Sequence, residues 1–320
     1  MTSATSTPFF DRTFLGLAGA LIALLIGGLF LPQWALSFGS VALYLGIVVL
    51  GMALLMRTGL VSFGQGLYYC LGAYAAGTLD HFFSLSDLLL MVVAGALLAG
   101  VVAGILGLLL SKYRDIFFAM LSLAFSMILY GLLVKTSQLG STDGFGLSVK
   151  TFAGVALSPA HTRYVIFAFA SVLAFGCAVF MHRYWCSHLG RLATAIRDNE
   201  LRVEYMGESV QRVIHLNYVI SAAMAGIGGA LMAGAIGHVD PETTANWTTS
   251  GEFVFIAILG GTGSVFAPFF GAGIFEAVRT FALERFPNTW QMTLGITMLL
   301  VMIFLPGGLW SAFRARRRIA

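Results

Sequence analysis

Charged residues are scarce in this chain. Asp, Glu, Lys and Arg together make up only 10% of its 320 residues, and 58% of the residues are hydrophobic. A typical soluble domain carries about 25% charged residues, so this composition excludes an ordinary soluble protein. The net charge of +4 does not indicate a nucleic-acid partner, because the arginines flank apolar runs, as in the RARRR stretch at residues 314–318.

Cysteines and catalytic motifs are also few or absent. The three cysteines, Cys70, Cys177 and Cys186, have neither the spacing of a metal site nor a plausible disulfide partner. The sequence contains no GxxxxGK[ST] motif and no HExxH motif, and its six histidines do not cluster. We therefore expect no enzyme, no catalytic residues, no metal and no cofactor on this chain. No A-x-A-like cleavage site follows the first apolar run, which predicts a retained span rather than a signal peptide.

Long apolar runs fill most of the chain. None shows the alternation of a membrane β-barrel, and backbone groups in lipid must bond internally, so each run is interpreted as a helix. The sequence predicts an all-α fold, a polytopic bundle of about 10 transmembrane spans (8–10) that forms a single membrane permease domain over residues 1–320. The runs are residues 14–31, 37–56, 61–78, 88–110, 116–134, 164–181, 218–236, 253–259, 267–283 and 290–305.

Glycine-rich stretches interrupt two of these runs. LGGTGS at residues 259–264, followed by Pro268, predicts either two short crossings joined by a tight cytoplasmic turn or a re-entrant segment. The stretch from residue 57 to residue 77 is loosely similar to residues 260–273. Broken spans at corresponding positions of two halves are typical of a transport pathway.

The densest charge lies between His182 and Asn217 and includes five arginines. Lys and Arg placement puts this segment in the cytoplasm, together with both chain termini. Within it, Leu192, Ile196, Val203 and Met206 recur at helical spacing, Arg197, Glu200, Arg202 and Glu204 occupy the other face, and Gly207 ends the predicted helix of residues 191–207. The helix could lie on the lipid surface, but its mixed acids and bases favour a protein socket.

A few polar residues lie inside apolar runs. Gln65 is either an interhelical hydrogen-bonding group or a contact for a solute. Ser122, Ser126 and Tyr130 form one helical stripe that either lines an aqueous path or bonds back to the helix's own carbonyls. Glu276 and Arg279 are spaced to pair, or to act in an ion relay. The GxxxG at Gly100 and Gly104 and the small residues Ser221, Ala225 and Gly229 predict close helix packing.

Several motifs in order resemble one known family. AIRDNELRVEYMG (residues 195–207) and YVISAAMAGIGGALMAG (218–234) are similar to the coupling segment and following span of ATP-binding-cassette importer permeases for branched-chain amino acids. GLVSFGQGLYYCLGAYAA (59–76), IFFAMLSLAFSMIL (116–129), GSTDGFGL (140–147), LGGTGSVFAPFFGA (259–272) and FLPGGLW (304–310) extend the resemblance from about residue 40 to the C-terminus. The longer of the family's two permease types fits better. Val203, Tyr68 and Tyr69 depart from its common pattern and leave the substrate open.

The resemblance implies a mechanism and a set of partners. Arg197, Asn199, Glu200, Glu204 and Gly207 would dock in a cytoplasmic ATPase. The partners would be a second homologous permease, two ATP-binding subunits that hold the ATP, a periplasmic solute-binding protein and the bilayer of a bacterial inner membrane. The cargo would be branched-chain amino acids or similar small amino acids, amides or carboxylates, with Gln65, Ser122, Ser126 and Tyr130 as path candidates. The alternative is an ion-coupled secondary transporter working through Glu276 without an ATPase.

Overall fold

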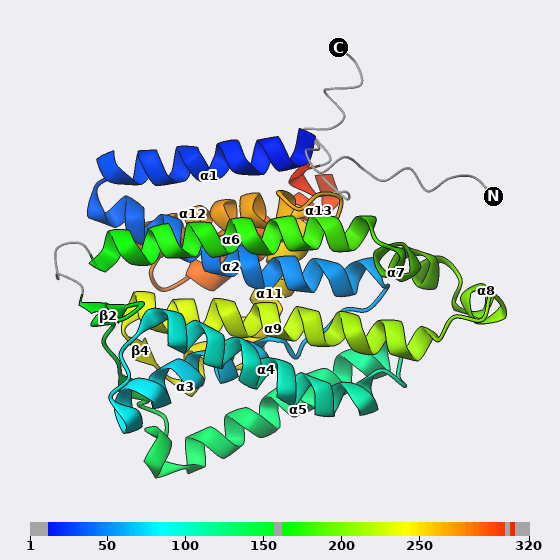
Figure 1. The fold of residues 1–320 in the computed structure, drawn as a ribbon, viewed down its shortest axis with the longest axis horizontal. Coiled ribbons are helices and arrows are strands. Elements are labelled where there is room, and N and C mark those ends of the chain that lie inside the picture. The colour runs from blue at the N-terminus through cyan, green and yellow to red at the C-terminus, as the bar shows by residue number, and fades with distance from the viewer. Residues whose placement is uncertain (1–11, 157–161, 305–307, 311–320) are drawn as a thin grey trace.

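The protein is a bundle of helices, seen in a computed structural model that describes residues 12–156, 162–304 and 308–310 (Figure 1). Most helices run roughly along the longest axis of the molecule, and short helices and strands occupy its two ends. In chain order the elements are α1 (Arg12–Phe30), α2 (Gln33–Arg57), α3 (Gln65–Phe83), α4 (Leu88–Leu110), α5 (Asp115–Lys135), η1 (Ser137–Leu139), β1 (Phe145–Gly146), β2 (Thr151–Phe152), β3 (Val155–Ala156), α6 (Thr162–Cys186), α7 (His188–Asp198), α8 (Glu200–Tyr205), α9 (Val210–Ile236), β4 (His238–Val239), α10 (Pro241–Thr244), α11 (Trp247–Gly260), α12 (Ala267–Arg285) and α13 (Trp290–Phe304).

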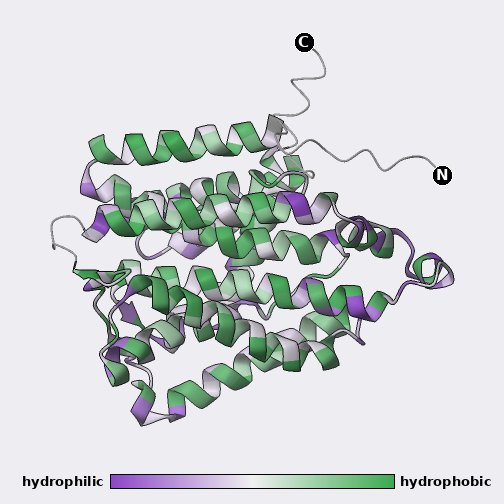
Figure 2. Ribbon diagram, in the orientation of Figure 1, coloured by the Kyte–Doolittle hydropathy of each residue, from purple (hydrophilic) through white to green (hydrophobic). Residues whose placement is uncertain are grey.

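Hydrophobic residues cover the long helices on all sides. Within the described residues, six helices are long and apolar enough to cross a membrane: α1, α2, α4, α5, α6 and α9. Figure 2 shows these helices as largely hydrophobic, with hydrophilic residues concentrated toward the two ends of the bundle. Side chains such as Leu97 on α4 and Ile128 on α5 are more than 60% exposed, as expected where lipid replaces water. The prediction of an all-α, multi-pass membrane bundle is confirmed.

Helix α9 lies at the centre of the bundle and packs against α2, α3 and α4. Small residues permit this close approach: a Cβ on Gly229 would clash with the Tyr69 carbonyl oxygen of α3, and a Cβ on Gly226 would clash with the Gly95 carbonyl oxygen of α4. The predicted ridge on α9 is therefore confirmed. The prediction for α4 is wrong, because Gly100 and Gly104 have no atom within 4 Å of an added Cβ, and the contact is made by Gly95 one turn earlier.

Two predicted helices have different boundaries. Residues 61–64 are not helical, although they belong to an apolar run, so α3 begins only at Gln65. The single helix predicted for residues 191–207 is two helices, α7 and α8, because Asn199 is extended with φ −163° and ψ 102°. Its side-chain oxygen accepts a hydrogen bond from the Arg202 N–H at 3.0 Å and so starts the second helix.

The two ends of the bundle differ. Arg57, Arg114 and the α7–α8 pair lie at one end, which we call the charged end, and β1 pairs with β4 at the other. The turn between α11 and α12 is at the charged end, because the Arg57 guanidinium donates to the Thr262 carbonyl oxygen at 3.2 Å. The turn predicted there therefore lies at the same end of the bundle as the α7–α8 pair. The N-terminus and the RARRR stretch lie outside the described residues.

Candidate functional site

The first candidate site is the α7–α8 pair, which we call the coupling segment (residues 187–209). Ser187 caps α7, its hydroxyl accepting from the Gly190 N–H at 3.3 Å. Gly207 has φ +85°, a left-handed conformation that favours glycine, and its N–H donates to the Glu204 carbonyl oxygen at 2.9 Å. Gly207 therefore ends α8 as predicted.

The coupling segment turns one apolar face inward and a second one outward. Leu192, Ile196 and Val203 are buried, as the spacing predicts. Met206 was expected on the same face, but it is 62% exposed, because the break at Asn199 rotates the second half of the segment. Met206 joins Leu201 (64% exposed) and Tyr205 (88% exposed) on the outer side of α8.

This outward group, Leu201, Tyr205 and Met206, is defined here as the α8 face. Leu201 and Tyr205 are four residues apart and Met206 follows directly, which is a helical spacing visible in the sequence. The charged neighbours Arg202 and Glu204 obscured it. Large apolar side chains gathered beside charges on an exposed surface are typical of a protein-docking site, where tyrosine is enriched.

The predicted docking residues have distinct environments. Glu200 accepts hydrogen bonds from the guanidinium of Arg114, at the α4–α5 turn, at 2.7 to 3.0 Å. Arg197 is half exposed and packs against Gly59, just after α2, where an added Cβ would lie 3.0 Å from its Cγ. Glu204 is exposed. Thus Glu200 and Asn199 hold the segment in place, while Arg197 and Glu204 present charge outward.

Helix α9 follows the coupling segment almost directly. Only Glu208 and Ser209 separate Gly207 from Val210, the first residue of α9, which is a tighter link than the sequence suggests. The helix is 27 residues long, about 40 Å at 1.5 Å per residue. The coupling segment is therefore joined through a two-residue link to a single long helix at the centre of the bundle.

A buried polar network anchors the base of α9. Asn217 is fully buried, accepts a hydrogen bond from the Tyr184 hydroxyl of α6 and donates to the Thr58 hydroxyl at 3.0 Å. Thr58 in turn donates to the Leu54 carbonyl oxygen of α2. Sequence reasoning missed this network, although an asparagine within an apolar helix is a signal, since buried amides require partners.

Three of the four path candidates, Gln65, Ser122 and Ser126, lie around the break before α3. The Gln65 amide nitrogen donates to the Ser221 hydroxyl of α9 at 2.5 Å, while its own carbonyl oxygen is buried without a hydrogen-bond partner among the described residues. Ser122 accepts from the Phe63 N–H at 3.1 Å, and Ser126 donates to the Ala245 carbonyl oxygen at 3.2 Å. Both serines are therefore engaged with other elements rather than only with their own helix.

The start of α3 lies beside the start of α11, and not beside the glycine-rich stretch at residues 260–273. The Gly66 N–H, in the first turn of α3, donates to the Ser250 hydroxyl in the first turn of α11 at 3.0 Å. Two helices thus begin side by side inside the bundle. The stretch at residues 260–273, which was compared with residues 57–77, instead turns at the charged end. Non-helical backbone at such depth is stable only because protein surrounds it.

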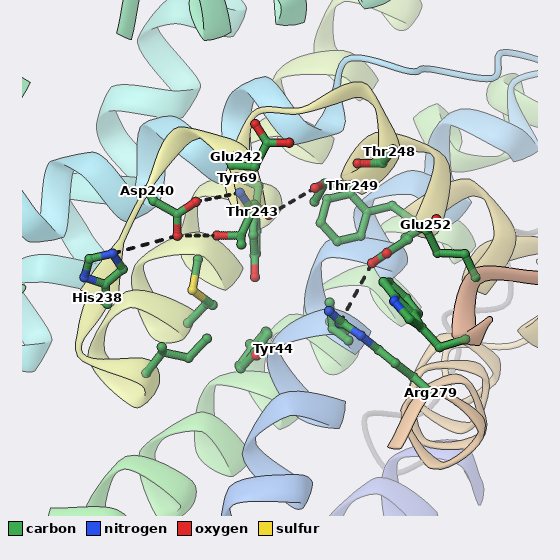
Figure 3. Close-up of a pocket in the computed structure, with 16 residues that line it drawn as sticks. Tyr44, Tyr69, His238, Asp240, Glu242, Thr243, Thr248, Thr249, Glu252 and Arg279 are labelled. Atoms are coloured by element: carbon green, nitrogen blue, oxygen red, sulfur yellow. Dashed lines mark hydrogen bonds and ion pairs between the residues drawn. The ribbon is translucent and has the colours of Figure 1, made fainter. Parts of the chain in front are cut away.

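A cavity of about 380 Å³ opens beyond this point (Figure 3). Its lining includes Ile236 and His238, at the β4 end of the bundle away from the coupling segment (Figure 1). Tyr130 reaches its edge, donating to the Glu242 carboxylate at 2.7 Å. Arg279 extends into it between Glu252 at 4.0 Å and Glu276 at 3.8 Å. The predicted pairing of Glu276 with Arg279 is present, and Glu252 is an additional partner that the sequence did not indicate.

The described residues contain neither a cluster of potential metal ligands nor a disulfide. In the parts of the chain that the structure describes, no group of three or more His, Cys, Asp and Glu side chains could hold a metal ion. Cys70, Cys177 and Cys186 are all free, and Cys186 is the last residue of α6 rather than part of a loop.

Comparison with known proteins gives a consistent result. Residues 34–303 match the family described as branched-chain amino acid transport system / permease component. The chain is 28% identical over 327 residues to the LivM high-affinity branched-chain amino acid transport system permease protein of Escherichia coli K12, covering 93% of this chain and 76% of that protein. The LivM protein of Salmonella typhimurium is also 28% identical, covering 85% of this chain and 69% of its own length.

A more distant similarity extends to a second type of permease. The LivH high-affinity branched-chain amino acid transport system permease protein of Salmonella typhimurium is 29% identical over 167 residues, which is 51% of this chain and 49% of that protein. No solved structure matches the chain. These relatives are transport permeases rather than enzymes.

Proposed function

Because the chain belongs to the family of permease components of branched-chain amino acid transport systems, we propose that it is the membrane-spanning subunit of an ATP-binding-cassette importer driven through its coupling segment. The observation that carries the proposal is the α8 face. Leu201, Tyr205 and Met206 stand exposed at one end of a membrane protein, and the link from there to the central helix α9 is very short. Such a surface fits a soluble protein partner rather than lipid.

Each of the five predicted coupling residues has a role in this proposal. Arg197 and Glu204 contact the ATPase directly, beside the apolar side chains of the α8 face. Asn199 starts α8 and Gly207 ends it, so these two fix its length and direction. Glu200 ties the segment to Arg114, which lets the α4–α5 turn move together with α8.

The rest of the assembly follows from the family. The charged end faces the cytoplasm of a bacterium, with both chain termini on the same side, and the chain lies in the inner membrane. A second, homologous permease completes the pathway, two ATPase subunits bind the ATP, and a periplasmic protein delivers the solute. The chain forms one permease domain of about ten spans, in which α3, α11, α12 and α13 add to the six long apolar helices. No nucleic acid is involved.

The cargo is a branched-chain amino acid, the solute that the relatives' names describe, or a similar small amino acid, amide or carboxylate. We place its route along the seam where α3, α5 and α11 meet. Ser122 and Ser126 hold the walls of the seam, Gln65 offers an unused carbonyl oxygen, and Tyr130 leads to Glu242 at the cavity.

The rival function is an ion-coupled secondary transporter that uses Glu276. In the structure Glu276 faces Arg279 at 3.8 Å, which suits a fixed ion pair. Uptake into vesicles that contain the whole assembly separates the two. We expect uptake to require ATP on the side of the membrane where the ATPase subunits bind, and to continue when an uncoupler is added. Uptake that persists without ATP and collapses with an uncoupler would establish the rival.

The α8 face supplies a direct test of docking. Replacing a buried interface tyrosine by alanine commonly costs about 2 kcal/mol or more of binding free energy, about 30-fold in affinity. We therefore expect Tyr205→Ala to weaken co-purification of the ATPase about 30-fold while leaving membrane insertion intact. Trp34→Ala is the matched control, because Trp34 is 74% exposed near the start of α2, at the opposite end. Equal ATPase recovery from both variants would refute docking at this face.

A further inference from the structure

We propose that the cavity beside Arg279 is a binding site within the permease itself, at which a zwitterionic amino acid pauses during passage. The choice of ligand class rests on the proposed function, but the site is argued from its own geometry. The cavity has a volume of about 380 Å³, within the range of roughly 300 to 1,000 Å³ in which small-molecule sites occur.

Arg279 supplies the positive charge of the site. Its guanidinium lies 4.0 Å from the Glu252 carboxylate and 3.8 Å from that of Glu276. Both distances exceed those of a hydrogen bond. The two carboxylates therefore hold the guanidinium by electrostatic attraction, and its N–H groups donate no hydrogen bond to either of them. A planar guanidinium in this state is suited to take a ligand carboxylate through two parallel hydrogen bonds.

Glu252 supplies the negative charge. One guanidinium stands between two carboxylates, which leaves an excess of one negative charge on this trio. Glu252 and Arg279 both line the cavity and face each other there (Figure 3), whereas Glu276 is not among the residues that line it. A ligand whose carboxylate occupies Arg279 would bring its ammonium group to Glu252, and both charges would then be matched.

The other acidic residues of the cavity wall, Asp240 and Glu242, already accept hydrogen bonds from the protein. Asp240 accepts from the Thr243 N–H at 2.7 Å and caps α10. Glu242 accepts from Tyr130 and from the Asn246 amide, both at 2.7 Å. These carboxylates are therefore satisfied within the protein. Glu252 differs, since its contact with Arg279 is the long one described above.

The other surfaces of the cavity suit an aliphatic side chain. Tyr69 and Phe253 form an edge-to-face pair with ring centroids 5.1 Å apart. Trp290 also lines the cavity, and the Arg279 guanidinium lies 5.9 Å from the centre of its ring. Apolar walls with a few convergent polar groups are the usual composition of a site for a small, partly apolar ligand. A branched aliphatic group on a zwitterion matches this combination.

The site is mechanically connected to the coupling segment. Met232 and Ile236, in the last turn and a half of α9, form part of the cavity wall. The first residue of the same helix follows the coupling segment at the opposite end. A movement of α9 along its axis would thus change the cavity and release its occupant.

The test measures binding by the full-length chain in lipid nanodiscs, without its partners. The probe is L-leucine, and the signal is the fluorescence of Trp290, with Trp290→Phe identifying that component. We expect a saturable change with leucine. It should be at least about tenfold weaker with 4-methylpentanoate, which lacks the ammonium group, and with isoamylamine, which lacks the carboxylate, because each loses one charge-assisted contact. These comparisons use the unmodified chain and do not depend on the folding of a variant.

Two variants locate the site. Arg279→Gln and Glu252→Gln should each weaken leucine binding about tenfold or more, whereas Arg163→Gln and Glu284→Gln remove an exposed charge outside the cavity wall and should leave it unchanged. Equal binding of leucine and both analogues, or no saturable binding at all, would overturn the proposal. Leucine binding without ATP-driven uptake by the assembly would refute the proposed function but not this site. ATP-driven uptake without leucine binding by the isolated chain would refute only the site.

Discussion

The guanidinium of Arg114 and the carboxylate of Glu200 lie 2.7 Å apart, although 86 residues separate them in the sequence. The pair joins the α4–α5 turn to the first residue of α8. Their side chains are 27% and 34% exposed, so the pair is partly screened from water. The coupling segment is therefore fastened to a neighbouring helix turn as well as to α6 and α9, which it follows and precedes.

Exchanging the two charges tests whether this pair positions α8. In Glu200→Arg, two cations face each other. We expect the observed position of α8 to be destabilised by about 1 kcal/mol or more, which lowers the population of that position roughly fivefold. ATP-driven uptake should drop by a similar factor. The double exchange Arg114→Glu with Glu200→Arg should recover most of it.

The control for this exchange is Arg191→Glu, which alters an exposed arginine of α7. It should change uptake much less than Glu200→Arg does. If the double exchange is as inactive as Glu200→Arg alone, Glu200 acts through direct contact with the ATPase, and the positioning role assigned to it is wrong.

Gly207 offers a test in which sterics and backbone conformation are separable. Nothing lies within 4 Å of a Cβ added there, but its φ of +85° disfavours side chains. A β-branched residue in this region costs about 1–2 kcal/mol, whereas asparagine tolerates it. We expect Gly207→Val to impair uptake severalfold and Gly207→Asn to remain near wild type.

The matched position is Gly263, in the α11–α12 turn at the same end, where space is also open and φ lies outside the left-handed region. Gly263→Val should have little effect on uptake. If Gly207→Asn is as impaired as Gly207→Val, the requirement at this position is for a small residue at an interface rather than for a left-handed backbone.

The sequence located the six long apolar helices because their signal is local. A run of twenty apolar residues between charges specifies a helix without knowledge of its neighbours, and α4 lies where the run at 88–110 places it. The break before Gln65 was not predictable in position. Residues 61–64 belong to an apolar run but are not helical, and the Phe63 N–H donates instead to the Ser122 hydroxyl, 59 residues away.

In the coupling segment, too, the local pattern was predictable and the tertiary contacts were not. Its amphipathic spacing and Gly207 indicated a terminated helix, but the kink at Asn199 changed which residues face outward. As a result Tyr205 and Leu201 were missed and Met206 was assigned to the wrong face. The partnership of Glu200 with Arg114, and the convergence of Glu252 on Arg279, depend on tertiary neighbours that no local pattern encodes.

Gln65 and Ser221 provide a test of structural against transport roles. Removing one member of a buried hydrogen bond leaves the other unsatisfied, which costs about 1–3 kcal/mol. Gln65→Leu and Ser221→Ala should each lower the thermal unfolding midpoint, and the double variant should lose less than their sum, since neither polar group then remains unpaired. Uptake is to be measured in parallel. A fall in uptake for Gln65→Leu with an unchanged unfolding midpoint would show that Gln65 contacts the cargo instead.

Asp87 makes the end opposite the coupling segment sensitive to pH. Burial raises the pKa of its carboxyl, but hydrogen bonds from the N–H groups of Gly154, Leu89 and Leu90 outweigh that effect and hold the pKa below its usual value of 3.8. Because the folded-state pKa is the lower one, the carboxylate stabilises the fold above pH 3.8, and this contribution is lost as the pH falls through the depressed value.

Asp87→Asn removes that pH dependence. One Asp87 oxygen accepts from Leu89 and Leu90 while the other accepts from Gly154 at 2.7 Å. An amide has only one acceptor oxygen, so one set of bonds must be lost. We expect the variant to unfold at a lower temperature than wild type at pH 6, with a loss of about 1 kcal/mol, and the difference between them to shrink as the pH falls below 3.8. Asp143→Asn, at an exposed loop position, should follow wild type throughout, and a difference between Asp87→Asn and wild type that stayed constant across this range would show that the Asp87 charge does not contribute.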